Sequence, residues 1–150
     1  MLSFLIFLPL VAVFVIFFVE KTNVKFFRNF SLFWSLLVFN ISLLLLFFFD
    51  SSYMGFQFVE KFDWLMLSNN SIVLGIDGIA LFMIILTTFL IPVCVLLSWN
   101  ASVKNNTKWY NIAFFLLESI LIGVFCSLDI LLFYILFEAV LIPMFFFLCV

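Results

Sequence analysis

The sequence has no histidine and very little charge. Only 9 % of its 150 residues are Asp, Glu, Lys or Arg, whereas soluble domains carry about 25 % charged residues. Because 69 % of the residues are hydrophobic, the polar side chains cannot cover a globule in water. We therefore predict that lipid surrounds most of the protein. The missing histidine also removes the commonest metal ligand and the usual acid–base catalyst.

Basic residues and cysteines are scarce as well. The six Lys and Arg form no dense patch and the net charge is -2, so nucleic-acid binding has no support. Cys94, Cys126 and Cys149 are odd in number, lie in apolar runs and lack ligand spacing. Neither a disulfide framework nor a metal site is indicated. We expect no cofactor and no redox centre in this chain.

Long apolar runs are what the chain does contain. A membrane-spanning helix needs about 20 apolar residues at 1.5 Å each. The last run, 109–150, would be about 60 Å long as one helix, twice the hydrocarbon thickness, so it should hold two helices. We predict an all-α membrane protein, a single helical unit with about five transmembrane helices. The expected spans are 1–19, 30–49, 79–99, 110–127 and 130–150, with an outer loop over 50–78.

The first span could be mistaken for a secretory signal peptide. It lacks a basic segment at its start, and no small-residue cleavage motif follows at 17–19. We therefore interpret 1–19 as a retained membrane helix.

Short polar residues mark several of the expected helix ends. Asp77 precedes the third span, and Ser127 and Asp129 lie in the turn between the last two spans. Their side-chain oxygens can accept hydrogen bonds from the free N–H groups of a first helical turn. We expect all three to act as helix caps.

The loop at 50–78 contains a second periodicity. In "FQFVEKFDW", residues 56–64, aromatic residues occupy four of the five even positions (Phe56, Phe58, Phe62 and Trp64) and polar residues most of the odd ones. An alternation of period two is typical of a strand. The polar segment "SNNS" at 68–71 could then turn the chain, so we expect a short hairpin on the outer face.

The basic residues also predict an orientation. The first and third loops hold five of them and the second loop holds one, Lys61. Since basic residues stay on the inner side of a membrane, the amino terminus should lie outside and Val150 inside.

Two glutamates interrupt the apolar spans. Glu138 follows Asp129 by nine residues, which places it about 14 Å below the outer surface. Pro143 has no N–H, so the carbonyl of Ala139 loses its helical partner beside this acid. A charge at the bilayer centre costs about 2.5 kcal/mol or more. We therefore predict that Glu138 lines a wet polar site and carries a proton.

Glu118 lies in the fourth span, about 10 Å from the inner surface. Its depth differs from that of Glu138 by about 6 Å, so both could belong to one polar chamber. Glu118 is accordingly a possible second proton site. The competing interpretation is that each acid is neutral and hydrogen-bonded for packing. No lysine lies inside an expected span, so a cationic partner must come from another polypeptide segment.

Two long stretches resemble a known family. "LGIDGIALFMIILTTFLIPVCVLLSW" (74–99) and "FCSLDILLFYILFEAVLIPMFFF" (125–147) are similar to the chain 4 family of respiratory complex I, the NADH–ubiquinone oxidoreductase. "FQFVE" at 56–60 looks like the plant and protist members. The resemblance covers roughly 50–150, whereas the earlier residues fit only as generic membrane helices.

The resemblance implies an antiporter-like fold of about fourteen helices with two inverted repeats, in the mitochondrial inner membrane. A glutamate of the fifth helix, in the motif "FEAVLIP" here, pairs with a lysine two helices later for proton translocation; this role transfers to Glu138. Glu118 matches an acid of the fourth helix in some relatives. FMN, iron–sulfur clusters, NADH and ubiquinone are expected in the complex, outside this chain. Expected partners are other membrane-arm subunits and lipid such as cardiolipin.

The chain departs from the family in its length. Family members are about three times as long, and the lysine partner and second repeat are absent here. We expect a split gene, with a second chain that supplies the remaining helices; a truncated sequence is the alternative. Two other functions stay open: a subunit of a multisubunit cation/proton antiporter, and a non-catalytic membrane scaffold.

Overall fold

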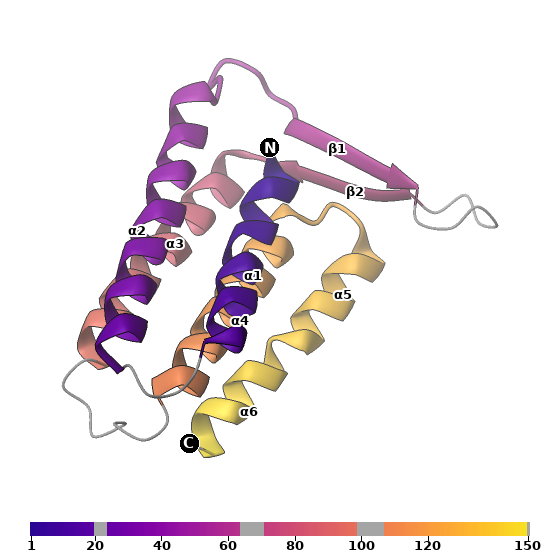
Figure 1. Cartoon of the computed structure of the whole chain (residues 1–150). Helices are drawn as coiled ribbons and strands as arrows, with labels where there is room; N and C mark the ends of the chain where they lie inside the picture. The colour runs from indigo at the N-terminus through magenta and orange to yellow at the C-terminus, as the bar shows by residue number, and fades with distance from the viewer. Residues whose placement is uncertain (20–23, 64–70, 99–106, 150) are drawn as a thin grey trace.

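The computed structural model describes residues 1–19, 24–63, 71–98 and 107–149. These residues form six helices and one two-stranded hairpin. The helices run up and down beside one another, and the hairpin lies across one end of the bundle (Figure 1). We call this the hairpin end, and the other, where α2 and α4 begin, the opposite end. The elements are α1 (Leu2–Phe18), α2 (Val24–Phe48), β1 (Gln57–Asp63), β2 (Ser71–Ile76), α3 (Gly78–Ser98), α4 (Thr107–Cys126), α5 (Ile130–Ala139) and α6 (Leu141–Cys149).

The predicted all-α membrane fold is confirmed by the length and composition of these helices. Among the described residues, four helical segments are long and apolar enough to cross a membrane. They lie at Lys25–Phe48, Gly78–Ser98, Thr107–Cys126 and Ile130–Phe147, the last combining α5 and α6. Helix α1 is apolar too but shorter, with 17 residues.

Helix α2 begins six residues earlier than expected. The sequence predicted a span from residue 30, but the helix starts at Val24 and includes Lys25 and Arg28. Charged residues did not end this helix because Lys and Arg can lay their aliphatic stems along apolar surface while the charged head reaches the interface. Arg28 is therefore part of the bundle.

Helix α4 is the central element of the bundle. It contacts every other helix of the described residues. Ile112 and Phe115 pack with Phe27 of α2 and with α1, while Phe114 packs with Ile91 of α3. Side chains on most sides of α4 are therefore buried, which agrees with its being the most buried of the four candidate spans.

The last span is broken at Val140. The backbone N–H of Val140 donates to Leu136 O at 3.1 Å, and Met144 N–H donates to Val140 O at 3.3 Å. In a continuous helix the N–H of residue 143 would donate to Ala139 O. Residue 143 is a proline, which has no N–H, so this helical hydrogen bond is missing. The expected span 130–150 therefore consists of two short helices, α5 and α6.

The expected strand and hairpin are confirmed. Strands β1 and β2 pair antiparallel, with Lys61 opposite Val73, and an irregularity lies between Gln57 and Glu60. The turn predicted around 68–71 falls largely outside the described residues. Beyond the hairpin itself, Leu128 N–H donates to Val73 O at 3.0 Å, which attaches β2 to the turn between α4 and α5.

Two of the three expected caps are confirmed. Asp77 Oδ1 accepts from the N–H groups of Ile79 (2.6 Å) and Ala80 (3.2 Å) at the start of α3. Asp129 Oδ1 accepts from Leu131 N–H at 3.3 Å at the start of α5. The prediction for Ser127 was wrong, because its hydroxyl instead donates to Val124 O at 2.8 Å. That bond satisfies a carbonyl in the last turn of α4.

Candidate functional site

Glu118 is enclosed in the bundle on the central helix. Its side chain is 0 % exposed, and neither carboxylate oxygen has a hydrogen-bond partner among the described residues. The next residue, Ser119, differs because its hydroxyl donates to Ile6 O of α1 at 2.7 Å. A buried polar group without a partner is rare and costs about 1–3 kcal/mol, so Glu118 requires an explanation other than packing.

A second unpartnered polar group lies on the same face of α4. Asn111 is 2 % exposed, and its Nδ2 has no hydrogen-bond partner within the described part of the chain. It precedes Glu118 by seven residues, so the two side chains are about 20° apart around the helix. Asn111 was not among the residues predicted from the sequence. The signal that marks it is its seven-residue spacing from Glu118 within one apolar span.

The third such group belongs to α2. Arg28 Nε is buried without a hydrogen-bond partner in the described residues. Its neighbour Phe27 packs against Ile112 of α4, the residue after Asn111. Arg28 lies in the loop between the first two spans expected from the sequence, so a cation within the bundle was not predicted.

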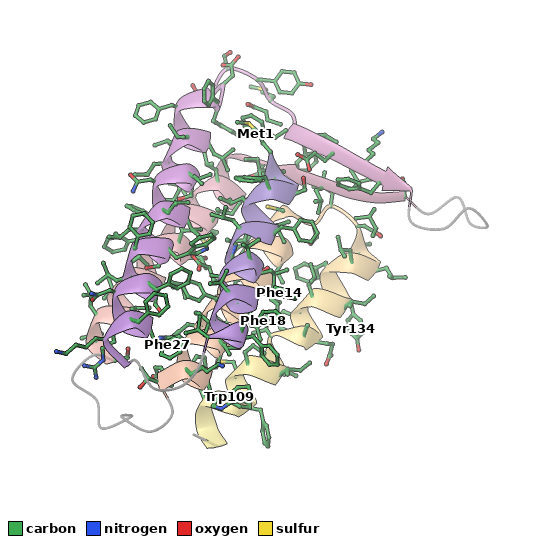
Figure 2. All side chains as sticks on the ribbon, viewed as in Figure 1. Met1, Phe14, Phe18, Phe27, Trp109 and Tyr134 are labelled. Carbon is green, nitrogen blue, oxygen red and sulfur yellow. The ribbon has the colours of Figure 1, made fainter. Side chains whose placement is uncertain are left out.

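Glu138 lies on the outer surface of this chain. Leu136 packs over Gly123 of α4, so its side of α5 faces α4. Glu138 comes two residues later, which corresponds to a rotation of about 200° around the helix axis. Its side chain is therefore on the side of α5 that faces away from α4. The Glu138 side chain is exposed. Tyr134, one turn earlier on the outer side of α5, is 62 % exposed (Figure 2). The surrounding side chains are also uncovered and apolar: Ile130, Leu131, Ile135, Phe137, Leu141, Ile142 and Phe145.

The two glutamates therefore do not share a chamber within the described residues. Glu118 is enclosed by the bundle, whereas Glu138 points away from it. The expectation of one polar chamber failed because depth follows from residue counting, but the direction of a side chain depends on how each helix is rotated against its neighbours.

A cavity of about 650 Å³ lies between α3, α4 and α6, apart from both acids. Thr87, Cys94 and Tyr110 are among its lining residues, but neither glutamate is. Within the described ranges, no three His, Cys, Asp or Glu side chains come together in a way that could hold a metal ion.

Comparison with known proteins identifies the family. No family model matches the chain. It is 49 % identical to NADH-ubiquinone oxidoreductase chain 4 of Marchantia polymorpha and 48 % identical to that of Arabidopsis thaliana, each over 144 residues, or 96 % of this chain. It is also 47 % identical, over 111 residues or 74 % of the chain, to NADH-quinone oxidoreductase subunit M of Rhodobacter capsulatus.

The chain matches only part of these relatives. It spans 29 % of the length of the Marchantia and Arabidopsis proteins and 21 % of the Rhodobacter protein. The identity is nevertheless high across nearly the whole of this chain, and the helical architecture agrees with a membrane subunit. The chain therefore belongs to the family of NADH-ubiquinone oxidoreductase chain 4 and NADH-quinone oxidoreductase subunit M.

Proposed function

We propose that this chain is part of a proton-translocating subunit in the membrane arm of respiratory complex I. It would couple NADH:ubiquinone electron transfer, performed in other subunits, to proton movement across the mitochondrial inner membrane. The observation that carries the proposal is Glu138, a carboxyl in the middle of an apolar span, two residues before the helix break at Val140. The family of the relatives supports it.

In this proposal Glu138 takes up and releases a proton. A cation that approaches a carboxyl favours its charged form, and withdrawal of the cation favours proton uptake. The nearby backbone break adds a polar group, because Ala139 O has no helical donor at Pro143. Glu118 serves as a second proton site. The lysine that would partner Glu138 comes from helices outside the described chain.

The uncovered face of α5 and α6 supports an interaction with further helices. The span Ile130–Phe147 is the least buried of the four, with 6 % of its residues buried, yet it contains an acid. A carboxyl is unfavourable against lipid tails, so a protein or water-filled surface should cover it. We propose that the remaining helices of the subunit do so, supplied by a second chain, with other membrane-arm subunits and lipid such as cardiolipin around them.

Localisation and cofactors follow from the same proposal. The amino terminus would lie on the intermembrane-space side and Val150 on the matrix side, as the basic residues indicate. FMN, the iron–sulfur clusters, NADH and ubiquinone would be bound by other subunits of the complex. The names of the relatives do not favour the alternative of a cation/proton antiporter subunit.

Replacing the carboxyl tests the proposal. In the assembled complex, Glu138→Gln should reduce the number of protons pumped per NADH oxidised, because an amide cannot release a proton. Tyr134→Phe is the matched control, since it removes a polar group from the same face of α5 one turn away. Near-wild-type pumping by an assembled Glu138→Gln complex would remove Glu138 from the mechanism.

A further inference from the structure

We propose that the seam between α2 and α4 is a hydrated route by which protons reach Glu118 from the opposite end of the bundle. The seam consists of Arg28, Ser31 and Ser35 on α2 and of Asn111 and Glu118 on α4. This inference rests on the proposed function and deepens it, because it gives Glu118 a side of access and names the residues along the way.

The unpartnered polar groups are the first line of support. The described residues contain four buried side-chain nitrogen or oxygen atoms without a hydrogen-bond partner, and all four belong to Arg28, Asn111 and Glu118. These residues come from only two helices, which contact each other. Polar groups of this kind are satisfied by water when space and further partners are present.

The direction of Glu118 is the second line of support. Around α4, its side chain points between Phe114, about 40° to one side, and Phe115, about 60° to the other. Leu32 of α2 packs against the cluster that contains Phe114 together with Ile91 and Val95 of α3, and Phe115 lies in one cluster with Phe27 of α2. We infer that Glu118, between these two phenylalanines, is directed towards α2, and Asn111 shares this face of α4. On α2, Arg28 and Ser35 are likewise seven residues apart and lie on one face.

The depths of these side chains agree as well. Both helices begin at the opposite end of the bundle, and Phe27 packs with Ile112 near their start. Measured from that contact, Ser31 lies about 6 Å deeper, Glu118 about 9 Å and Ser35 about 12 Å. Ser31 and Ser35 are fully buried and donate to Phe27 O (2.6 Å) and Leu32 O (3.0 Å), so their oxygens are left to accept hydrogen bonds from water.

The seam is closed towards the hairpin end. One turn beyond Glu118, Ile122 is fully buried in an apolar cluster with Val38 and Leu45 of α2. The next buried hydroxyl on α2, Ser42, is paired with Thr88 of α3, with 2.7 Å between the two oxygens. Water and protons would therefore reach Glu118 only from the opposite end of the bundle, past Arg28 and Asn111.

Hydrogen–deuterium exchange of the Glu118 carboxyl tests the seam in the assembled complex. The C=O band of Glu118 is assigned by infrared difference spectroscopy as the band lost in Glu118→Gln, and its shift in D₂O reports proton access. Asn111→Leu should slow this exchange by about tenfold or more, which corresponds to roughly 1.4 kcal/mol of barrier. Ser119→Ala is the matched control: a buried polar residue of α4 that faces α1.

The outcomes separate this inference from the proposed function. Unchanged exchange in Asn111→Leu overturns the seam but leaves Glu118 as an exchangeable acid. A wild-type Glu118 band that never exchanges overturns both the seam and the role of Glu118 as a proton site. If Asn111→Leu fails to assemble, Ser31→Val removes a hydroxyl from the same route, and unchanged exchange in that variant overturns the seam.

Discussion

Glu60 of β1 accepts a hydrogen bond of 3.0 Å from the backbone N–H of Leu2, the first residue of α1. Its other oxygen accepts from Ser3 N–H at 3.1 Å, and the carboxylate also contacts the Met1 nitrogen. The N-cap residue of α1, Met1, makes no side-chain cap hydrogen bond, and the first turn of the helix contains no acid. The hairpin thus supplies from 58 residues away the anion that the helix start requires.

Removing this carboxylate should loosen the start of α1. Loss of a helix cap costs about 1 kcal/mol, so Glu60→Ala should speed amide hydrogen exchange at Leu2 and Ser3 roughly fivefold. Lys61→Ala is the control, because Lys61 is the exposed neighbour of Glu60 on β1. Equal exchange in the two variants would show that Glu60 does not cap α1.

The same contact should depend on pH. Partial burial raises the pKa of Glu60, but the hydrogen bonds from the Met1 nitrogen and from Ser3 outweigh it and hold this pKa below its ordinary value. Because the folded-state pKa is lowered, the stabilisation is complete above the unfolded-state pKa and is lost as pH falls through the folded one. Amide exchange at the start of α1, corrected for its intrinsic pH dependence, should therefore rise on acidification in the wild type and not in Glu60→Gln.

Lys108 should stabilise the other end of α1. Its Nζ donates to Phe17 O at 2.8 Å and to Val19 O at 2.7 Å, so a cation lies at the carboxyl end of a helix. Lys108→Met keeps the aliphatic stem and loses the charge, and it should lower stability by about 1–2 kcal/mol. Thermal unfolding in detergent measures the effect. Lys108→Arg should retain most of the stability, and similar losses in both variants would contradict this role.

Pro143→Ala tests whether the break in the last span contributes to function. An N–H at this position can donate to Ala139 O, so α5 and α6 should merge into one continuous helix that is more stable. The polar site beside Glu138 would lose its free carbonyl, and proton pumping should fall although assembly is retained. Unchanged pumping with a continuous helix would show that the break is only a kink.

Glu138→Leu separates a proton carrier from a structural acid. If the subunit is a non-catalytic scaffold, leucine is tolerated or stabilising, because a desolvated carboxyl is lost. If Glu138 carries protons, the complex assembles but pumping is lost to the same degree as in Glu138→Gln. Measuring assembly by native electrophoresis and pumping on the same samples distinguishes these results.

Close packing between α4 and α5 gives a further prediction. A Cβ at Gly123 would come within 3.1 Å of Leu136 Cδ1, which is closer than ordinary contact. Gly123→Val should therefore force α5 away from α4 and destabilise the chain by about 1–3 kcal/mol. Leu136→Ala in the same chain should recover part of the loss. No recovery would show that the strain lies elsewhere.

The local features of this fold were readable in the sequence. The lengths of the apolar runs gave the helices, the alternation at 56–64 gave the strand, and Asp77 and Asp129 were recognised as caps. Each of these depends on neighbouring residues along the chain, so a single sequence contains the required signal.

Contacts between distant elements could not be obtained in this way. The bond between Glu60 and α1, the burial of Arg28 on α2 and of Asn111 on α4, and the opposite directions of Glu118 and Glu138 all depend on how the elements are placed and rotated against one another. Side-chain packing around α4 sets that rotation, and helix periodicity alone leaves it open. The predicted start of α2 at residue 30 was also wrong, because a cationic residue can either end a membrane span or lie within its first turns.

The hairpin has a mechanical consequence for the bundle. Glu60 holds the start of α1, Val73 O holds the turn between α4 and α5, and β2 leads through Asp77 directly into α3. One element outside the apolar spans thus sets the relative heights of α1, α3 and the turn between α4 and α5 at one end. Sliding of these helices along one another should therefore meet most resistance at the hairpin end, and pivoting about the hairpin should disturb the fewest of these contacts.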